Sequence, residues 1–392
     1  MKSHSTRQDG IETAPLPSVL LPLLDESFVQ SCGLIERYTV ALAEQVLVAS
    51  ALDRALAQPR SLDEAIVATG LNGAAARVPV RWLLEILAEA GRVERFNEDG
   101  AVRYRIAAGD IDDPGKLLRE QEALDARCLP SYRIAAIAAE HYPAVLRGEL
   151  AGEQALFGPD TLDAWGDYFS NDNPLYAIAN SIGAILIEQH LDGAANALLE
   201  IGGGQGGGAQ AVWRRLEASR RTRDVGAYRF TELSGIFLRR AQKMLRFAFP
   251  DAPFSFAKLN IDQPFSNAGI APASCTMIYG VNVLHVAHDL AATLVEVRKA
   301  LTPSGVLVIS ECVRPFEGRP IYVEFVFNLL ESFRSPVLVP EWRPNGGFLT
   351  PEQWRTALQA NGFKDIRFLP DIAMVRDVIP GFVVAGISAT PA

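Results

Sequence analysis

Residues 197–208 read ALLEIGGGQGGG, and this stretch decides the fold. An apolar, strand-like run ends at Glu200 and is followed by six glycines in the seven positions 202–208, after which AVWRRLEA has the spacing of an amphipathic helix. Glycines let the backbone turn tightly and approach a ligand closely. A strand, a glycine loop and a helix in this order predict a ligand-binding loop at the carboxyl end of a parallel strand.

The same alternation continues toward the C-terminus. Further strand candidates are AYRFTEL, FSFAKLNI, TMIYGVNVL and GVLVISE, with amphipathic segments such as IFLRRAQKML and LVEVRKAL between them. This pattern predicts a parallel sheet with helices on both faces. The tail differs, because FKDIRFLP and GFVVAGISA follow the helix PEQWRTALQANGF without a second crossover helix. The fold class is therefore α/β, a Rossmann-like sheet with an antiparallel edge pair.

The N-terminal part has a different, mainly helical pattern. Apolar residues recur every three or four positions over 28–56, Ser61 and Glu64 form a capping-box signature, and a third helix is expected over 77–90. GRVERFNEDGAVRYRI then reads as two short strands around a turn. Three helices and a hairpin predict a winged-helix-like unit.

Such units often bind DNA, but the charges argue against it here. The segment SLDEAIVATGLNG has no basic residue, and the helix after it has only Arg77 and Arg81 at its start. The 37 basic and 46 acidic residues leave a net charge of -9, and no aromatic residues interleave the one arginine cluster, at 214–223. We expect no nucleic-acid partner, and a unit that forms a homodimer interface or one wall of a substrate pocket.

Composition excludes several other classes. With 49% hydrophobic and 21% charged residues, the 392-residue chain has the composition of globular domains. The four cysteines contain no CxxC pair, the N-terminus MKSHSTRQDG is polar, and no long uncharged apolar run occurs. We expect no membrane partner and a cytoplasmic location.

The glycine loop does not by itself select a nucleotide. Gly202, Gly204 and Gly206 stand at GxGxG spacing, and Gly207 completes the GxGxxG spacing of dinucleotide sites. Two features favour S-adenosylmethionine: Glu200 is suited to a cationic amino group, and the sheet has an antiparallel edge. Glu232 ends the next strand, where a carboxylate could bind a ribose diol. The remaining candidates for cofactor contacts are Leu233, Asn260, Ile261 and Asn282.

Acid–base candidates follow the next two strands. His285 ends YGVNVLH and Glu311 ends GVLVISE, which places both at the carboxyl edge of the sheet. A neutral imidazole can accept a proton near pH 7, and a carboxylate can orient it. His288 is a reserve base. A metal site is not expected, because no suitable third ligand lies near the two histidines.

Aromatic residues flank this chemistry on both sides. A stripe of them over 157–176 suggests a lid, and a long insertion after Glu311 suggests the floor of an apolar acceptor pocket. The substrate-contact candidates are Tyr168, Tyr176, His288, Tyr322, Phe325 and Trp342.

These motifs resemble the class I S-adenosylmethionine-dependent methyltransferases, through LLEIGGGQGG, YRFTELS, YGVNVLH, LTPSGVLVISE and ANGFKDIRF. The pieces LFGPDTLDAWGDYFSNDNPLYAIAN, RFTELSGIFLRRA and NVLHVAHDLAATLVEVRKAL are similar to C-methyltransferase domains of polyketide synthases. The winged-helix start and the His-bearing segment resemble small-molecule O-methyltransferases. The resemblance implies that His285 and Glu311 form a catalytic dyad.

The resemblance also implies a division of the chain. We expect a winged-helix-like dimerisation domain over 1–110, a helical linker and lid over 111–190, and a methyltransferase domain that binds S-adenosylmethionine over 191–392. We expect the acceptor to be a small or carrier-tethered, polyketide-like or aromatic molecule. The dyad slightly favours methylation at carbon, and the winged-helix start favours oxygen.

Two other classes remain open. A nicotinamide-dependent oxidoreductase requires an unbroken parallel sheet with phosphate contacts at the helix start. A ligand-sensing DNA-binding regulator requires a basic recognition helix, which the sequence lacks.

Overall fold

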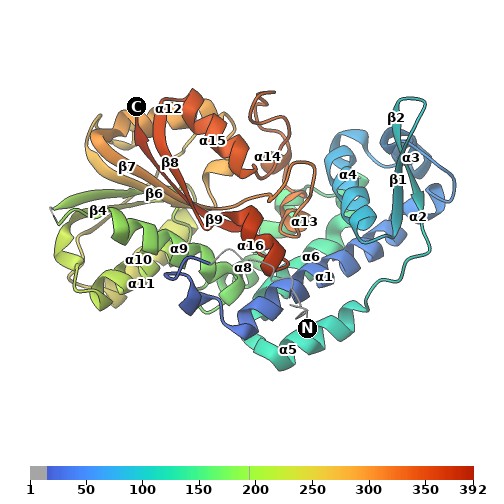
Figure 1. Ribbon diagram of the computed structural model, residues 1–392, viewed down its shortest axis with the longest axis horizontal. Coiled ribbons are helices and arrows are strands. Elements are labelled where there is room, and N and C mark those ends of the chain that lie inside the picture. The colour runs from blue at the N-terminus through green and yellow to red at the C-terminus, as the bar shows by residue number, and fades with distance from the viewer. Residues whose placement is uncertain (1–15, 194) are drawn as a thin grey trace, which may run out of the picture.

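The computed structural model describes residues 16–193 and 195–392. The N-terminal segment MKSHSTRQDG, on which the expectation of a cytoplasmic chain partly rests, lies outside the described residues. Within them the chain forms a sheet-containing part and a helical part (Figure 1).

The main sheet has seven strands in the order β5-β4-β3-β6-β7-β9-β8. Strands β3 to β7 are mutually parallel, whereas β9 runs antiparallel to both β7 and β8. The strands are β3 (Asn196–Glu200), β4 (Val225–Thr231), β5 (Phe254–Ala257), β6 (Cys275–Val281), β7 (Leu301–Cys312), β8 (Phe363–Leu369) and β9 (Val384–Pro391).

The strand order places a crevice at the centre of the sheet. From β3 the chain moves outward through β4 and β5, then returns to add β6 on the other side of β3. Ligands of open parallel sheets bind outside the carboxyl ends of the strands where the order reverses. Both the α/β class and the antiparallel edge pair are confirmed, and a short helix, α16 (Ile372–Val378), lies in the connection between β8 and β9.

Helices cover both faces of the sheet (Figure 1). One layer contains α9 (Pro174–His190), α10 (Gly207–Ala218) and α11 (Gly235–Ala248), and the other contains α12 (Leu290–Ala300) and α15 (Pro351–Ala360). Apolar residues of β3, β4 and β6 pack into the first layer, so the strands are buried on both faces, as expected for parallel strands.

The helical part is organised around the long helix α1 (Glu26–Ala49), which packs against α5 (Pro114–Asp125) and α6 (Leu129–Leu146). The Asp25 side chain caps the N-terminus of α1. At the other end, Ala51 has a φ of 57° in the left-handed region, which interrupts the helix predicted over 28–56. The expected capping box of Ser61 and Glu64 is present.

Three shorter helices and a hairpin follow α1. They are α2 (Leu52–Ala55), α3 (Leu62–Thr69), α4 (Gly73–Glu89), β1 (Val93–Glu98) and β2 (Ala101–Ile106). Helix α4 begins four residues before the predicted start at 77, because the Asn72 side chain accepts hydrogen bonds from the N–H groups of Ala74 and Ala75. The elements predicted for this unit are thus present, while its role as a dimerisation domain and the three domain boundaries stay predictions.

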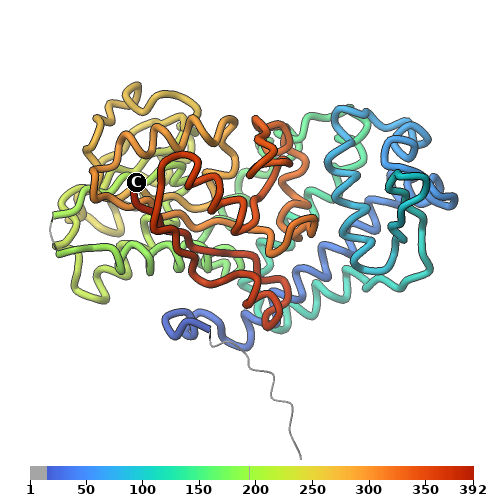
Figure 2. The backbone as a smooth tube through the Cα atoms, turned by 45° about the horizontal axis from the view of Figure 1, so that its top comes forward, coloured from blue at the N-terminus to red at the C-terminus, as the bar shows by residue number. Residues whose placement is uncertain are grey.

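Short elements connect the two parts. An insertion after β7 carries α13 (Glu324–Phe327) and α14 (Glu331–Arg334) and lies between the sheet and the helical part in both views (Figures 1 and 2). The aromatic stripe predicted as a lid over 157–176 runs from the end of α7 (Gly152–Phe157) through α8 (Leu162–Tyr168) to the first turn of α9. The single-turn helices are η1 (Leu21–Leu23), η2 (Ala126–Cys128), η3 (Pro159–Thr161), η4 (Thr222–Asp224), η5 (Phe265–Ala268) and η6 (Leu284–Val286).

Candidate active site

The glycine loop has a backbone that only glycine allows at two consecutive positions. A Cβ atom on Gly202 would lie 2.2 Å from Val283 Cγ2, and one on Gly203 would lie 2.3 Å from Phe230 Cε2. Gly202 also has a φ of 59°, in the left-handed region. The backbone of the loop therefore packs directly on the side chains of Val283 and Phe230, and the loop also lines a pocket.

A polar pocket lies over this loop, with about 640 Å³ of empty space. Its floor is the glycine backbone, and its walls include Glu200, Gln205 and Glu232. The side-chain Nε2 atom of Gln205 is buried and has no hydrogen-bond partner among the described residues. The pocket thus holds two carboxyl groups and one unused amide donor.

Glu200 ends β3 and is almost completely buried, with 2% of its surface exposed. Burial raises the pKa of its carboxyl to about 8, although hydrogen bonds from the Tyr228 hydroxyl, at 2.9 Å, and from the Ala209 N–H oppose this shift. Such a carboxyl is mostly protonated near pH 7, and a cationic ligand group beside it would stabilise its ionised form.

Glu232, after β4, is held by backbone N–H groups. One carboxylate oxygen accepts from Gly204 N at 2.9 Å and the other from Ser234 N at 2.7 Å. The carboxylate therefore ties the glycine loop to the start of α11 and faces the pocket from a fixed position.

A second cavity, mostly apolar, adjoins the first. It encloses about 1060 Å³ of empty space and shares Phe169, Tyr176 and Asn282 with the polar pocket. Asn282 has a φ of 49° and accepts the N–H of Cys312 through Oδ1 at 2.7 Å, which fixes it between the two spaces. A molecule in the apolar cavity would therefore lie next to a molecule in the glycine-loop pocket.

His285 and Glu311 meet at the wall of the apolar cavity. His285 Nδ1 lies 2.6 Å from Glu311 Oε2, and both side chains are buried. Glu311 Oε1 accepts the N–H groups of Val283 and Leu284 at 3.1 and 2.9 Å. The imidazole also packs on the Phe348 ring, with a centroid distance of 4.4 Å. Two backbone N–H groups and the imidazole Nδ1 thus converge on one carboxylate, and His285 itself lines the cavity.

Many of the predicted site residues are brought together. Glu200, Gly202, Gly204, Glu232 and Asn282 line the polar pocket, and Tyr168, Tyr176, Tyr322 and His285 line the apolar cavity.

Other predicted cofactor contacts lie outside the polar pocket. Gly206 is the N-cap residue directly before α10 and packs on α11, where an added Cβ would lie 2.9 Å from Met244 Cε. Leu233 is exposed. Asn260 accepts the N–H of Asp262 within its own loop, and the Ile261 carbonyl accepts the Thr293 hydroxyl, which joins this loop to α12.

Three predicted substrate residues lie outside the apolar cavity. His288 is exposed, and its N–H donates to Asp262. Phe325 stacks on Tyr142, with ring centroids 4.7 Å apart, and therefore joins the insertion to α6. Trp342 is buried in the insertion and does not line the cavity.

Sequence reasoning missed one wall of the cavity. Ile35 and Thr39 of α1 and Ser131 and Ala135 of α6 line it. No local signal distinguishes these residues from ordinary helix-core positions, since their role depends on how the helical part sits against the sheet. Ile35 and Thr39 belong to the N-terminal unit expected over 1–110, whereas Ser131 and Ala135 belong to the linker expected over 111–190.

Neither a metal cluster nor a membrane-spanning helix is found in the part of the chain that the structure describes. Within 16–193 and 195–392, no group of three or more His, Cys, Asp and Glu side chains could hold a metal ion. Over the same residues, no helix is long and apolar enough to cross a bilayer. The four cysteines are free and buried.

Curated relatives are polyketide synthases. The chain is 29% identical over 239 residues to highly reducing polyketide synthase 2 of Gibberella zeae, covering 60% of this chain and 9% of that protein. It is 26% identical over 392 residues to a polyketide synthase-nonribosomal peptide synthetase of Aspergillus clavatus, covering 93% of this chain. The chain therefore spans only about a tenth of the length of these relatives, 9% in both cases. No family model matches it.

Solved structures show the same fold. The carbon methyltransferase of CurJ superposes with a TM-score of 0.77 at 25% identity and covers 95% of both chains. The trans-methyltransferase CalH, solved in complex with SAH, has a TM-score of 0.60 at 20% identity, over 94% of this chain and 92% of that chain.

The strand order, the glycine-loop pocket and these comparisons define the class of fold: the chain has the fold of the methyltransferases to which it is similar. Within this class it resembles the carbon methyltransferase domains of polyketide synthases.

Proposed function

We propose that this chain methylates an activated carbon atom of a polyketide-like acyl acceptor, with His285 as the general base. The observation that carries this proposal is the hydrogen bond of 2.6 Å between His285 Nδ1 and Glu311 Oε2, at the wall of the apolar cavity that adjoins the glycine-loop pocket.

The dyad has the arrangement that proton removal requires. Glu311 accepts from Nδ1–H, which selects the tautomer with an unprotonated Nε2, and its charge stabilises the imidazolium that forms. Nε2 would take the proton from a carbon flanked by carbonyl groups, and the electron pair left on that carbon would form the bond to the methyl group. The bond from the methyl group to the sulfonium sulfur would break, and its electron pair would stay on sulfur, so that a neutral thioether would leave. Burial of both side chains keeps water from competing for the base.

The residues of the polar pocket fit the cofactor. S-adenosylmethionine supplies an electrophilic methyl group on a sulfonium ion. Glu200 would face its ammonium group, since this carboxyl is buried and lacks a cationic partner among the described residues. Glu232 would accept the ribose hydroxyls, while the glycine backbone, Gln205 and Asn282 would complete the walls.

The comparison with CurJ favours carbon over oxygen as the methyl acceptor, because the solved CurJ structure is a carbon methyltransferase. Its superposition covers 95% of this chain. The mostly apolar lining suits an acyl chain. The relatives are polyketide synthases, and this supports an acceptor carried as a thioester on a carrier protein.

The test is a methyl-transfer assay with ¹³C-methyl S-adenosylmethionine and β-ketoacyl thioesters on N-acetylcysteamine or on a carrier protein. We expect the labelled methyl on the carbon between the two carbonyl groups. A label on oxygen, or equal turnover by His285→Ala, would overturn the proposal.

A further inference from the structure

Arg343 is a buried arginine that contacts the backbone of the histidine turn. Its Nη2 donates to the His285 carbonyl at 2.6 Å and its Nη1 to the Ala287 carbonyl at 2.8 Å. Only 1% of its surface is exposed, although it lies in the insertion after β7, 58 residues from His285 in the chain.

This arginine is buried without a direct carboxylate partner. No ion pair joins it to an acidic residue among the described residues, and Asp289 and Asp262 act on it only from a distance. Burial accordingly lowers the pKa of its guanidinium to about 10, and its Nε has no hydrogen-bond partner. Burial of an unpaired charge is strongly unfavourable, so the position of Arg343 requires an explanation beyond packing.

The two carbonyls belong to the end of η6 (Leu284–Val286). Carbonyls at the end of a helical turn have no partner inside it. The planar guanidinium has several donors in a fixed fork, which matches two such oxygens at once. At the other end of the turn, the N–H groups of Val283 and Leu284 are bound by Glu311. The turn that carries His285 is thus held from both ends.

We infer that Arg343 is a positioning residue for the general base: it fixes the backbone of His285 so that the imidazole stays aligned with Glu311 and with the acceptor cavity. This inference rests on the proposed function of His285.

Other contacts of the insertion support the same role. Val337 N donates to the His288 carbonyl at 2.7 Å, and the rings of Phe333 and Phe348 pack on the imidazole with centroid distances of 5.9 and 4.4 Å. The insertion therefore contacts the histidine turn at several points. Among the described residues of the insertion, Arg343 is the only one whose charged side chain donates hydrogen bonds to carbonyls of this turn. The insertion that the sequence suggested as a pocket floor thus also supports the base.

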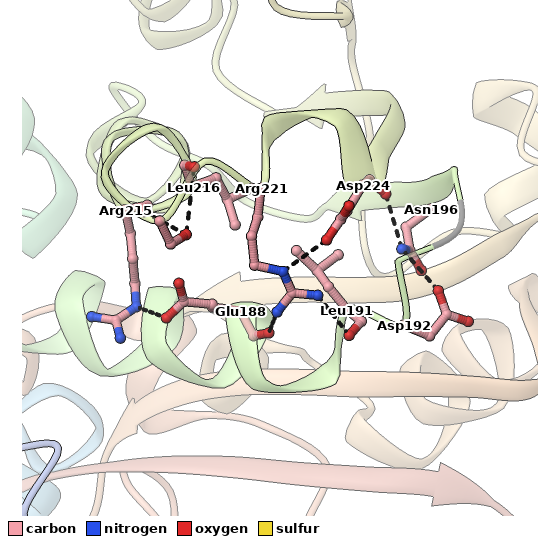
Figure 3. A network of polar contacts seen from close by, with 9 residues as sticks. Glu188, Leu191, Asp192, Asn196, Arg215, Leu216, Arg221 and Asp224 are labelled. Atoms are coloured by element: carbon pink, nitrogen blue, oxygen red, sulfur yellow. Dashed lines mark hydrogen bonds and ion pairs between the residues drawn. The ribbon is translucent and has the colours of Figure 1, made fainter.

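Arg221 provides a matched control in the same chain (Figure 3). Its Nη1 donates to the Glu188 carbonyl at 2.7 Å and its Nη2 to the Leu191 carbonyl at 2.9 Å, at the end of α9. It differs in having a carboxylate partner, Asp224, at 2.7 Å. Removal of either guanidinium group should destabilise the fold, but of these two arginines only Arg343 contacts the histidine turn.

The experiment compares Arg343→Met, Arg343→Lys, Arg221→Met and His285→Ala in the full chain. For each variant, kcat, KM for a β-ketoacyl thioester, SAH affinity by calorimetry and Tm are measured. The ¹H NMR resonance of the proton between His285 Nδ1 and Glu311, expected far downfield, is recorded as well.

We expect Arg343→Met to lower kcat by roughly 10- to 100-fold, the range for misplaced catalytic groups, with KM and SAH affinity changed less than about twofold. The downfield resonance should shift or broaden, and Arg343→Lys should restore part of kcat. Arg221→Met should keep kcat and the resonance, whatever its Tm.

Two results would overturn the inference: an unchanged kcat and resonance in Arg343→Met, or an equal loss of kcat in Arg221→Met at equal Tm. If Arg343→Met does not fold, the Arg343→Lys variant provides the test. A lowered Tm with an unchanged kcat and an unchanged resonance in Arg343→Lys would show that Arg343 has only a structural role. Full activity of His285→Ala would instead reject the proposed base itself.

Discussion

Glu311 contacts the imidazole of His285 with one carboxylate oxygen and the backbone of the turn that carries His285 with the other. Oε2 lies 2.6 Å from the imidazole Nδ1, while Oε1 accepts the N–H groups of Val283 and Leu284, which precede the histidine. One buried carboxylate thus sets both the tautomer of the imidazole and the start of the turn that carries it. The arrangement joins β6 to β7 at the sheet edge where the two cavities meet.

Replacement of Glu311 by Gln tests the tautomer. The amide oxygen can still accept the backbone N–H groups, but the amide NH₂ then faces Nδ1, which can only accept, so the ring proton moves to Nε2. We expect kcat to fall by roughly 10²- to 10⁴-fold, the usual contribution of general base catalysis. SAH affinity, measured by calorimetry, should stay within about twofold. Unchanged kcat would show that Glu311 does not orient the base.

Replacement of Glu200 by Gln tests the buried carboxyl of the polar pocket. Its pKa is about 8 in the folded chain, against 4.5 for an ordinary glutamate such as that of the unfolded chain, so the folded state holds the proton more tightly. The stability from this group is complete below pH 4.5 and is lost as the pH rises to about 8. The variant escapes this loss, and its Tm advantage should grow over that range.

The size of this effect can be bounded. One pKa unit corresponds to about 1.4 kcal/mol, which raises Tm by roughly 1 to 2 °C in a chain of 392 residues, because the entropy of unfolding grows with chain length. The same variant should bind SAH at least about tenfold more weakly, but should bind 5′-methylthioadenosine, which lacks the ammonium group, as the native chain does. Equal loss for both ligands would argue against an ammonium contact by Glu200.

Gly203→Ala tests the close packing of the glycine loop. The new Cβ would lie 2.3 Å from Phe230 Cε2, so the loop must move. We expect destabilisation of about 1 to 3 kcal/mol, as for other overpacked sites, and loss of SAH binding in calorimetry. Gly91→Ala is the control, because its φ of 74° imposes strain while nothing lies within 4 Å of an added Cβ. If the control weakens SAH binding equally, loop packing is not the cause.

Ala135→Leu tests the wall that α6 gives to the apolar cavity. The larger side chain would enter the space that an acyl chain occupies. We expect kcat/KM for long acyl thioesters to fall by roughly 10- to 200-fold, the range for small changes in an apolar pocket, with short thioesters little affected. Ala136→Leu, one position along α6 and outside the cavity lining, is the matched control. Equal effects at every chain length would place the acceptor elsewhere.

Much of the fold could be predicted because it depends on local signals. A few adjacent residues are enough to predict the glycine loop after a buried strand, the capping box at Ser61 and the alternation of strands and helices. The strand ends then determine where Glu200, Glu232 and His285 must lie, since parallel strands end at the same edge of a sheet.

The rest depends on contacts between segments far apart in the chain. An aromatic residue in the insertion can face the cavity, as Tyr322 does, or pack on another helix, as Phe325 does on Tyr142. An isolated arginine such as Arg343 carries no sequence signal, because its function lies in the backbone that it contacts. The predicted homodimer and cytoplasmic location remain predictions.

The most direct measurement is the exchange of the acceptor's carbon-bound hydrogen with solvent deuterium, followed by NMR with a β-ketoacyl thioester and SAH in place of the methyl donor. The account predicts exchange above the uncatalysed rate in the native chain and only background exchange in His285→Ala. Exchange that is equally fast in His285→Ala would contradict the assignment of His285 as the base.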